Sequence, residues 1–172
     1  MKLLVTGGLG FIGSNFILKL LNETNEFDII NVDAELYGAN QKNLDSVKNH
    51  KKYEFVKGNI TNKRLMEELI SKCDAVVNFA AESFVDRSIN NADPFLVSNI
   101  RGAFTILDII TKQKKRMIQI STDEVFGSLS TGTADEQTKF NPSSPYAATK
   151  AAAELLINSF SVTFHPDVVI TR

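Results

Sequence analysis

The fold of this 172-residue chain is decided at its amino terminus, by Lys2-Leu3-Leu4-Val5-Thr6-Gly7-Gly8-Leu9-Gly10-Phe11-Ile12-Gly13. Residues 2–6 form a short apolar run typical of a buried strand, and the run ends at paired glycines. Residues 11–21 then carry apolar side chains at helical spacing, at positions 12, 16, 17, 20 and 21. The stretch therefore predicts a strand, a tight turn and a helix that begins directly after the turn.

Three glycines of this turn each meet a separate steric demand. Gly7 permits the tight turn, Gly10 lets the backbone approach a pyrophosphate, and Gly13 lets helix and strand pack closely. The first amides of the helix then face the diphosphate. Asp33 ends the next strand, where a carboxylate accepts hydrogen bonds from a ribose and repels a 2′-phosphate. We therefore expect NAD rather than NADP, the alternative being a plain turn and a surface acid.

Strand-like runs alternate with helical periods along the rest of the chain. The runs are 28–32, 53–57, 75–79, 117–121 and 168–171, and the helices are 63–71, 94–111 (capped by Asp93) and 145–164. This alternation predicts one α/β domain over residues 1–172. Its parallel sheet is covered on both faces, in the Rossmann-like doubly wound order 3-2-1-4-5-6. The polar segment 127–141 predicts a long loop of the kind that is usually functional.

Composition excludes several functional classes. The net charge is −1, from 19 basic and 20 acidic residues, so we expect no nucleic-acid partner. The sequence contains no run of about 18 apolar residues, so no membrane span is predicted. Cys73 is the sole cysteine, and His50 and His165 are far apart, so we expect neither a disulfide framework nor a metal site. These features favour a cytoplasmic protein.

Tyr146 and Lys150 lie four residues apart and therefore share one face of the last predicted helix. A phenol with a pKa of about 10 is a poor base, and a lysine ammonium about 4 Å away lowers that pKa substantially. We expect Tyr146 to act as a base and Lys150 to assist it and to bind the nicotinamide ribose. Taken alone, the same spacing is compatible with packing and a solvated amine.

The glycine spacing and the Tyr-x-x-x-Lys motif together resemble the extended short-chain dehydrogenase/reductase family. The segment Ser121-Thr122-Asp123-Glu124-Val125-Phe126-Gly127 resembles the S-T-D-E-V-Y-G of its dTDP-glucose 4,6-dehydratase members. Further similar stretches are 80–83, 85–89, 98–100 and 142–146. The resemblance implies an NAD-dependent lyase that converts dTDP-glucose to dTDP-4-keto-6-deoxyglucose and water. NAD-dependent 4-epimerases and decarboxylases of nucleotide sugars, which generally lack the adjacent acids, are the alternative.

The resemblance also implies a role for each site residue. As catalytic residues, Tyr146 and Lys150 serve the oxidation, Thr122 positions the sugar oxygen, Glu124 removes the C5 proton, and Asp123 protonates the departing C6 hydroxyl. The implied cofactor-binding residues are Gly7, Gly10, Phe11, Ile12, Gly13, Asp33, Ala34, Leu36, Asn59, Ile60, Phe79, Ala80, Ala81, Ser83, Ser98, Ser121, Tyr146 and Lys150. The implied substrate-binding residues are Ser83, Thr122, Asp123 and Glu124, and no metal is implied.

The sequence departs from the family pattern at several positions and at its end. Asn78 and Phe84 replace histidines, Asn59 replaces an aspartate and Phe126 replaces a tyrosine. The usual carboxy-terminal substrate domain is expected to be missing, which predicts an NAD-binding domain with little activity alone or a non-catalytic dinucleotide-binding module. Residues that distinguish dTDP- from UDP-sugars belong to that domain. The resemblance further implies a homodimer formed through helices 94–111 and 146–164.

Overall fold

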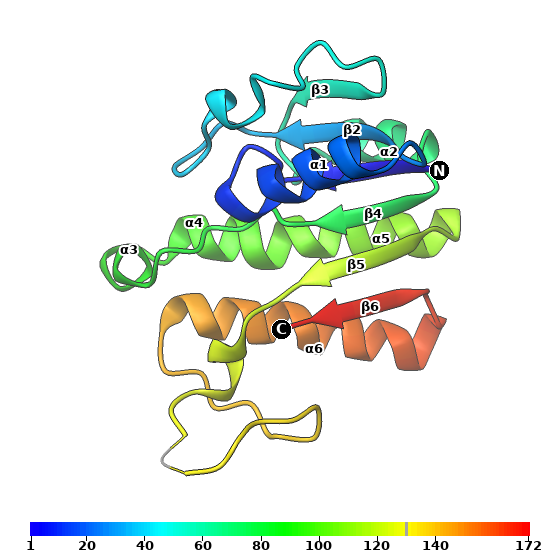
Figure 1. Cartoon of the computed structure of the whole chain (residues 1–172). Coiled ribbons are helices and arrows are strands. Elements are labelled where there is room, and N and C mark those ends of the chain that lie inside the picture. The colour runs from blue at the N-terminus through cyan, green and yellow to red at the C-terminus, as the bar shows by residue number, and fades with distance from the viewer. Residues whose placement is uncertain (130) are drawn as a thin grey trace.

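The computed structural model describes residues 1–129 and 131–172, so Ser130 of the expected loop lies outside the described residues. Six parallel strands form one sheet in the order β3-β2-β1-β4-β5-β6 (Figure 1). Their bounds are β1 (Lys2–Thr6), β2 (Asp28–Asp33), β3 (Tyr53–Lys57), β4 (Ala75–Asn78), β5 (Arg116–Ile120) and β6 (Val168–Thr171). The predicted topology is confirmed, and the bounds agree with the predicted runs to about one residue at each end.

Helices cover the two faces of the sheet unequally. They are α1 (Phe11–Glu23), α2 (Lys63–Ser71), α3 (Val85–Asn90), α4 (Asp93–Phe95), α5 (Ala103–Gln113) and α6 (Pro145–Phe164). Shorter helical segments are η1 (Gln41–Leu44), η2 (Leu96–Gly102) and η3 (Asp123–Phe126). In Figure 1, α1 crosses one face, and α2, α5 and α6 lie on the other. The Asn62 and Ser144 side chains cap α2 and α6, because they accept from the first-turn amides of these helices.

Most of the core consists of two apolar layers that the sheet separates, and a smaller cluster of Val125, Phe126 and Ala151 lies between η3 and α6. Leu4 of β1 packs with Met66 of α2 in one layer, while its neighbours Leu3 and Val5 pack with Ile17 of α1 in the other. Successive strand residues point to opposite faces, so a strand that is covered on both sides is a continuous apolar run. This packing holds the carboxyl ends of the central strands at one common edge, the left side of the sheet in Figure 1.

The long helix predicted over residues 94–111 is present as a helical run over residues 93–113, but its cap and its regularity differ from the prediction. Asp93 lies inside the first turn of α4 instead of capping it, and the π-helical segment η2 separates α4 from α5. Within η2, the Asn99 amide accepts from the Glu82 backbone N–H at 2.8 Å and donates to the Glu82 carbonyl and the Thr149 hydroxyl. Asn99 thus ties the loop after β4 to α6. Helix periodicity in the sequence carries no information on such long-range bonds. The short helix α3 was also not predicted from the sequence.

Over residues 1–129 and 131–172, no helix combines the length and apolarity needed to cross a bilayer. The same residues contain no group of three or more His, Cys, Asp or Glu arranged to hold a metal ion.

Candidate active site

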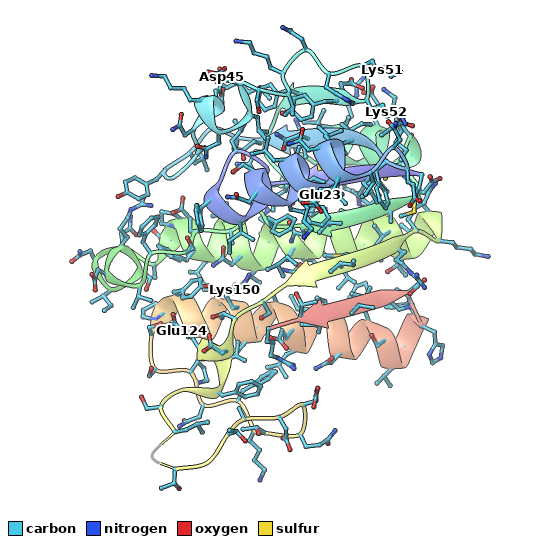
Figure 2. All side chains as sticks on the ribbon, viewed as in Figure 1. Glu23, Asp45, Lys51, Lys52, Glu124 and Lys150 are labelled. Carbon is cyan, nitrogen blue, oxygen red and sulfur yellow. The ribbon has the colours of Figure 1, made fainter. Side chains whose placement is uncertain are left out.

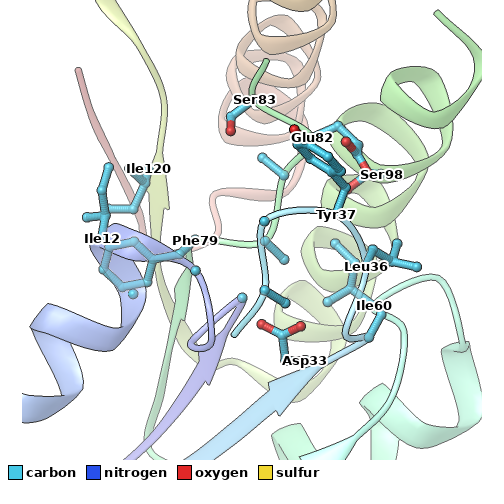
Figure 3. A pocket seen from close by; sticks show the side chains of 18 of the residues that line it. Ile12, Asp33, Leu36, Tyr37, Ile60, Phe79, Glu82, Ser83, Ser98 and Ile120 are labelled. Carbon is cyan, nitrogen blue, oxygen red and sulfur yellow. The ribbon is translucent and has the colours of Figure 1, made fainter. Parts of the chain in front are cut away.

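A pocket of about 350 Å³ opens at the carboxyl edge of the sheet, beyond the ends of β1, β2, β4 and β5. Open α/β sheets bind ligands at this edge. Every residue that the sequence analysis named as cofactor-binding lines the pocket. In Figure 3, Ile12, Phe79 and Ile120 lie on one side of the pocket, and Leu36 and Ile60 lie on the other with the Asp33 carboxylate between the sides. Residues from distant parts of the chain therefore form one cavity.

The glycine turn is shaped by close backbone contacts. Gly7 has φ +70°, and a Cβ atom there would lie 2.6 Å from the backbone of Ala80. A Cβ at Gly13 would lie 2.5 Å from the Gly7 carbonyl oxygen, so Gly13 packs against the turn itself. Beside Gly10, the nearest atom to an added Cβ is that same oxygen at 3.4 Å. The fold therefore requires glycine at 7 and 13, whereas position 10 has free space beside it.

The amino terminus of α1 presents unpaired donors to this pocket. Its N-cap is Gly10, which has no capping side chain, and its first turn holds no acidic residue. The first amides of a helix have no acceptor within the helix, and its dipole is positive at this end. Phe11 and Ile12 of the same turn line the pocket with exposed side chains. The arrangement suits an anionic group such as a phosphate.

Asp33 joins the pocket wall to the glycine turn. One carboxylate oxygen accepts from the Leu9 N–H at 3.0 Å, and the other accepts from the Glu35 N–H at 2.8 Å. An ionised carboxylate accommodates about four hydrogen bonds, so acceptor capacity remains for a ligand. The sequence analysis expected only the ligand contact, whereas the structure adds this role in holding the turn.

Asn59 lines the pocket, but its side-chain oxygen is engaged within its own turn. Its Oδ1 accepts from the backbone N–H of Thr61 at 2.9 Å and from the Thr61 hydroxyl at 2.8 Å. A side-chain amide oxygen has two lone pairs, and both are used. The cause is local, because Asn readily bonds the backbone two residues ahead of it in a turn.

Tyr146 and Lys150 both line the pocket from α6, but the ammonium does not act on the phenol as expected. The Lys150 amine donates to the Ile120 carbonyl at 2.5 Å, and burial lowers the pKa of Lys150 to about 8 against the raising effect of Glu154. Burial also raises the pKa of Tyr146; an interaction with the Thr122 hydroxyl lowers it, and the Glu124 and Asp123 charges raise it further. The predicted lowering of the Tyr146 pKa is therefore wrong for this structure, because burial outweighs every other influence.

The acidic segment after β5 lies next to Tyr146 but outside the pocket wall. Thr122 caps η3, and its hydroxyl accepts from the Glu124 N–H at 3.2 Å. Asp123 and Glu124 are exposed, and Asp123 lines a second hollow. Figure 2 shows Glu124 and Lys150 at the same end of the sheet, far from the surface charges Asp45, Lys51 and Lys52. The structure therefore brings these acids near the predicted base.

Several pocket residues were missed by the sequence analysis. They are Val32, Tyr37, Gly38, Ala39, Gly58, Glu82, Phe84 and Ile120. Phe84 meets Tyr37 edge to face at 5.0 Å, and Arg87 lies 3.9 Å over Tyr37 while its guanidinium pairs with Glu82 at 2.7 Å. Gly58 directly follows β3 and Ile120 ends β5, and that position is the signal that could have identified them, whereas Tyr37, Glu82 and their neighbours lie further along the loops after β2 and β4.

The departure at Asn78 is accommodated by a buried row of side chains beneath the pocket. Thr6 at the end of β1 donates to Asn78 Oδ1, and Asn78 Nδ2 donates to Gln119 Oε1 at 2.8 Å. Gln119 Nε2 then donates to the Ile120 carbonyl, which also accepts from Lys150. Asn78 thus belongs to a satisfied network across three strands, as buried polar groups require.

Sequence comparison identifies relatives that match nearly the whole of this chain. The chain is 43% identical over 173 residues to a low-salt glycan biosynthesis protein of Haloferax volcanii, covering all of this chain and 56% of that protein. It is 42% identical to a dTDP-glucose 4,6-dehydratase of Mycobacterium tuberculosis, covering 93% of this chain and 49% of that enzyme. The chain thus spans about half the length of the curated relatives it matches.

Solved structures agree with this result. The dTDP-glucose 4,6-dehydratase DesIV of Streptomyces venezuelae, solved with NAD bound, gives a TM-score of 0.96 at 40% identity and covers all of this chain and 55% of its own. A UDP-glucuronic acid 4-epimerase of Bacillus cereus was solved in complex with UDP-glucuronic acid and NAD. It gives a TM-score of 0.93 at 29% identity, and the match covers 100% of this chain and 56% of the epimerase chain. The family described as GDP-mannose 4,6 dehydratase matches residues 4–172. The expected family resemblance is confirmed, and the chain belongs to this family.

Proposed function

We propose that this chain binds NAD and carries the acid and base groups of a nucleotide-sugar 4,6-dehydratase. The observation that carries the proposal is the position of Asp123 and Glu124, whose charges act on Tyr146 at the rim of the pocket. Similarity to NAD-bound dehydratases over the whole chain supports it. The 4-epimerase at a TM-score of 0.93 makes epimerisation the second candidate, but the paired acids have no role in that reaction.

The residues present fit a dinucleotide. The α1 amino terminus suits the diphosphate, and the free space beside Gly10 permits its close approach. The remaining acceptor capacity of Asp33 suits a ribose diol, and its negative charge disfavours a 2′-phosphate. When bound, NAD supplies reversible hydride acceptance, so that the overall change is loss of water.

The chain's own residues supply the proton transfers. Tyr146 takes the proton of the sugar C4 hydroxyl while Thr122 holds that oxygen, and the ketone that results acidifies the neighbouring C5 proton. Glu124 removes this proton, and Asp123 protonates the C6 hydroxyl that leaves as water. Because burial and the two acids raise the Tyr146 pKa, Tyr146 works as a base only when positive charge is brought to the pocket.

A product assay tests this reaction. Incubation of any longer product of the coding sequence with NAD and either dTDP-glucose or UDP-glucose should yield a 4-keto-6-deoxy sugar, identified by mass spectrometry as the loss of water. The 172-residue chain alone, which spans about half the length of its relatives, should yield little of it. A C4-inverted sugar of unchanged mass would instead support an epimerase. Binding of NAD with neither product in any form of the protein would indicate a non-catalytic dinucleotide-binding module.

We further propose a homodimer through the helices of the α5/α6 face, and a cytoplasmic location. Apolar side chains project from these helices; the exposed ones are Leu96, Val97, Phe104, Leu155, Val162 and Phe164. Three of the five alanines of α6, Ala147, Ala151 and Ala153, are instead buried within the chain, so their small size serves the core. Light scattering of the wild type and of Val162→Asp should show a dimer that the variant weakens.

A further inference from the structure

Glu154 is a buried carboxyl group that the proposed chemistry does not use. It lies four residues after Lys150 on α6, as Lys150 lies four after Tyr146, so the three residues share one face of the helix. The Glu154 side chain is 0% exposed, and it does not line the pocket. An uncompensated charge in such a place would cost several kcal/mol, so its partners show what it does.

Two groups donate to the Glu154 carboxylate, and its charge acts on a third. Arg172, which follows β6, donates through Nε to Oε1 at 3.2 Å and to Oε2 at 3.0 Å, and through Nη2 to Oε2. The Ser121 hydroxyl, which lines the pocket, donates to Oε1. Lys150 is the third group, since the Glu154 charge favours its ammonium. One acid is therefore shared by two pocket residues and one guanidinium.

The direction of the Ser121 hydrogen bond follows from this arrangement. Both oxygens of Glu154 accept from Arg172, so the carboxylate has no proton to give and the hydroxyl must be the donor. With its one proton committed, the Ser121 oxygen offers only lone pairs to the pocket. It can accept from an amide N–H or a ribose hydroxyl, but it cannot donate to a ligand carbonyl.

The second consequence concerns charge at Lys150. The titratable groups on α6 near Lys150 are Tyr146 and Glu154, and those on or next to the neighbouring η3 and β6 are Asp123, Glu124 and Arg172. Charged side chains on the other elements packed against α6 are Asp86 and Arg87 on α3, Asp93 on α4, Arg101 in η2, and Asp108 and Lys112 on α5. Among all of these, Glu154 is the charge that acts on Lys150, and it opposes the effect of burial.

We propose that Glu154 is a positioning residue of the pocket: it fixes Ser121 as an acceptor and supplies the counter-charge that keeps Lys150 an ammonium. Arg172 bonds the same carboxylate, so its positive charge reduces the effect of the Glu154 charge on Lys150. The inference rests on the proposed dinucleotide site for its function, but its electrostatic part is measurable without any ligand.

Competitive labelling with isotopic acetic anhydride, read at Lys150 by peptide mass spectrometry, tests the charge effect in the full 172-residue chain. Only the neutral amine reacts, so Glu154→Gln should speed labelling at pH 7 about fivefold, the result of a pKa lower by about one unit. Arg172→Gln should slow it about twofold, because Glu154 then acts on Lys150 alone. Asp108→Asn, which removes an acid on α5 away from Lys150, is the matched control and should change nothing.

The two variants are expected to change the labelling rate of Lys150 in opposite directions, and this distinguishes the proposal from a purely structural role. If Glu154 and Arg172 only held the fold together, both substitutions would loosen the site and both would speed labelling, which would overturn the proposal. Arg172 lies at the edge of the fold, so its variant remains informative if Glu154→Gln does not fold. An unchanged rate in a folded Glu154→Gln protein would also overturn it.

Calorimetry with NAD tests the effect on Ser121. A glutamine at position 154 can donate as well as accept, so the Ser121 hydroxyl loses its fixed direction, and NAD affinity should fall about tenfold. Ser121→Ala should weaken NAD similarly, and the double variant should add little, because both changes remove the same acceptor. Additive losses would overturn this part, whereas a wild-type chain that binds no NAD would refute the proposed function and leave the labelling result intact.

Discussion

The glycine turn and the acidic segment η3 face the same ligand edge but are built in opposite ways. The turn is held by the Ala80 backbone, which packs against Gly7, and by the Asp33 carboxylate, which accepts from the Leu9 N–H. In η3, the two acids are exposed, whereas Val125 and Phe126 of the same short turn are buried. The glycine turn is therefore part of the folding core, whereas the two acids of η3 can be substituted with little loss of stability.

Substitution at Gly7 should cause the largest loss of stability in the glycine turn. Gly7→Ala combines a positive φ with a Cβ placed 2.6 Å from the Ala80 backbone, so the free energy of unfolding should fall by about 4 kcal/mol. The control is Gly132→Ala, which has φ +81° but no atom of the described residues within 4 Å and should lose only about 1 kcal/mol. Urea unfolding of both variants measures the difference, and equal losses would show that the contact with β4 is unimportant.

Lys150 should show the next largest effect, through the pH dependence of stability. Its pKa is about 8 when folded and 10.5 for the free side chain, so the unfolded chain binds more protons between these values and stability rises with pH across this window. Relative to Lys150→Met, the wild type should gain about 3 kcal/mol between about pH 7 and pH 11. Cys73, whose pKa burial raises to about 11, titrates in both proteins and cancels. A flat difference would mean that Lys150 is solvated.

Gly10 should separate binding from folding. Because an added Cβ has only the Gly7 oxygen at 3.4 Å beside it, Gly10→Ala should leave the unfolding midpoint nearly unchanged. The methyl group would occupy the space where we place the diphosphate, so NAD affinity should fall about tenfold or more, about 1.4 kcal/mol. Calorimetry and urea unfolding on the same sample measure both quantities. Unchanged affinity would place the phosphates elsewhere.

The smallest effect on stability is expected in η3. Asp123→Asn and Glu124→Gln change exposed side chains, so the free energy of unfolding should change by less than about 0.5 kcal/mol, and NAD affinity should be unchanged. Any 4-keto-6-deoxy sugar formed by the active protein should nevertheless be lost, because both proton transfers of the elimination are removed. Retained product formation would show that these acids are not catalytic.

The sequence anticipated most of the cofactor side because the demands there are local. Strand and helix periods, the glycine spacing and the acid at the end of β2 are each written in a few neighbouring residues. The residues missed, such as Tyr37 and Glu82, lie in loops whose positions depend on Arg87 and Asn99 from other segments. Local patterns do not carry that information.

By itself, then, the sequence determined the strand order, the glycine turn, the placement of Tyr146 and Lys150 on one helix, and the family. Only the tertiary structure decided that Lys150 donates to the Ile120 carbonyl, that Asn59 bonds Thr61, and that Glu154 joins Ser121 to Arg172. The physical reason is that periodicity and backbone sterics act between neighbours along the chain. Hydrogen-bond partners and burial, which set the direction of a hydroxyl or the charge of an amine, arise largely between segments brought together by folding.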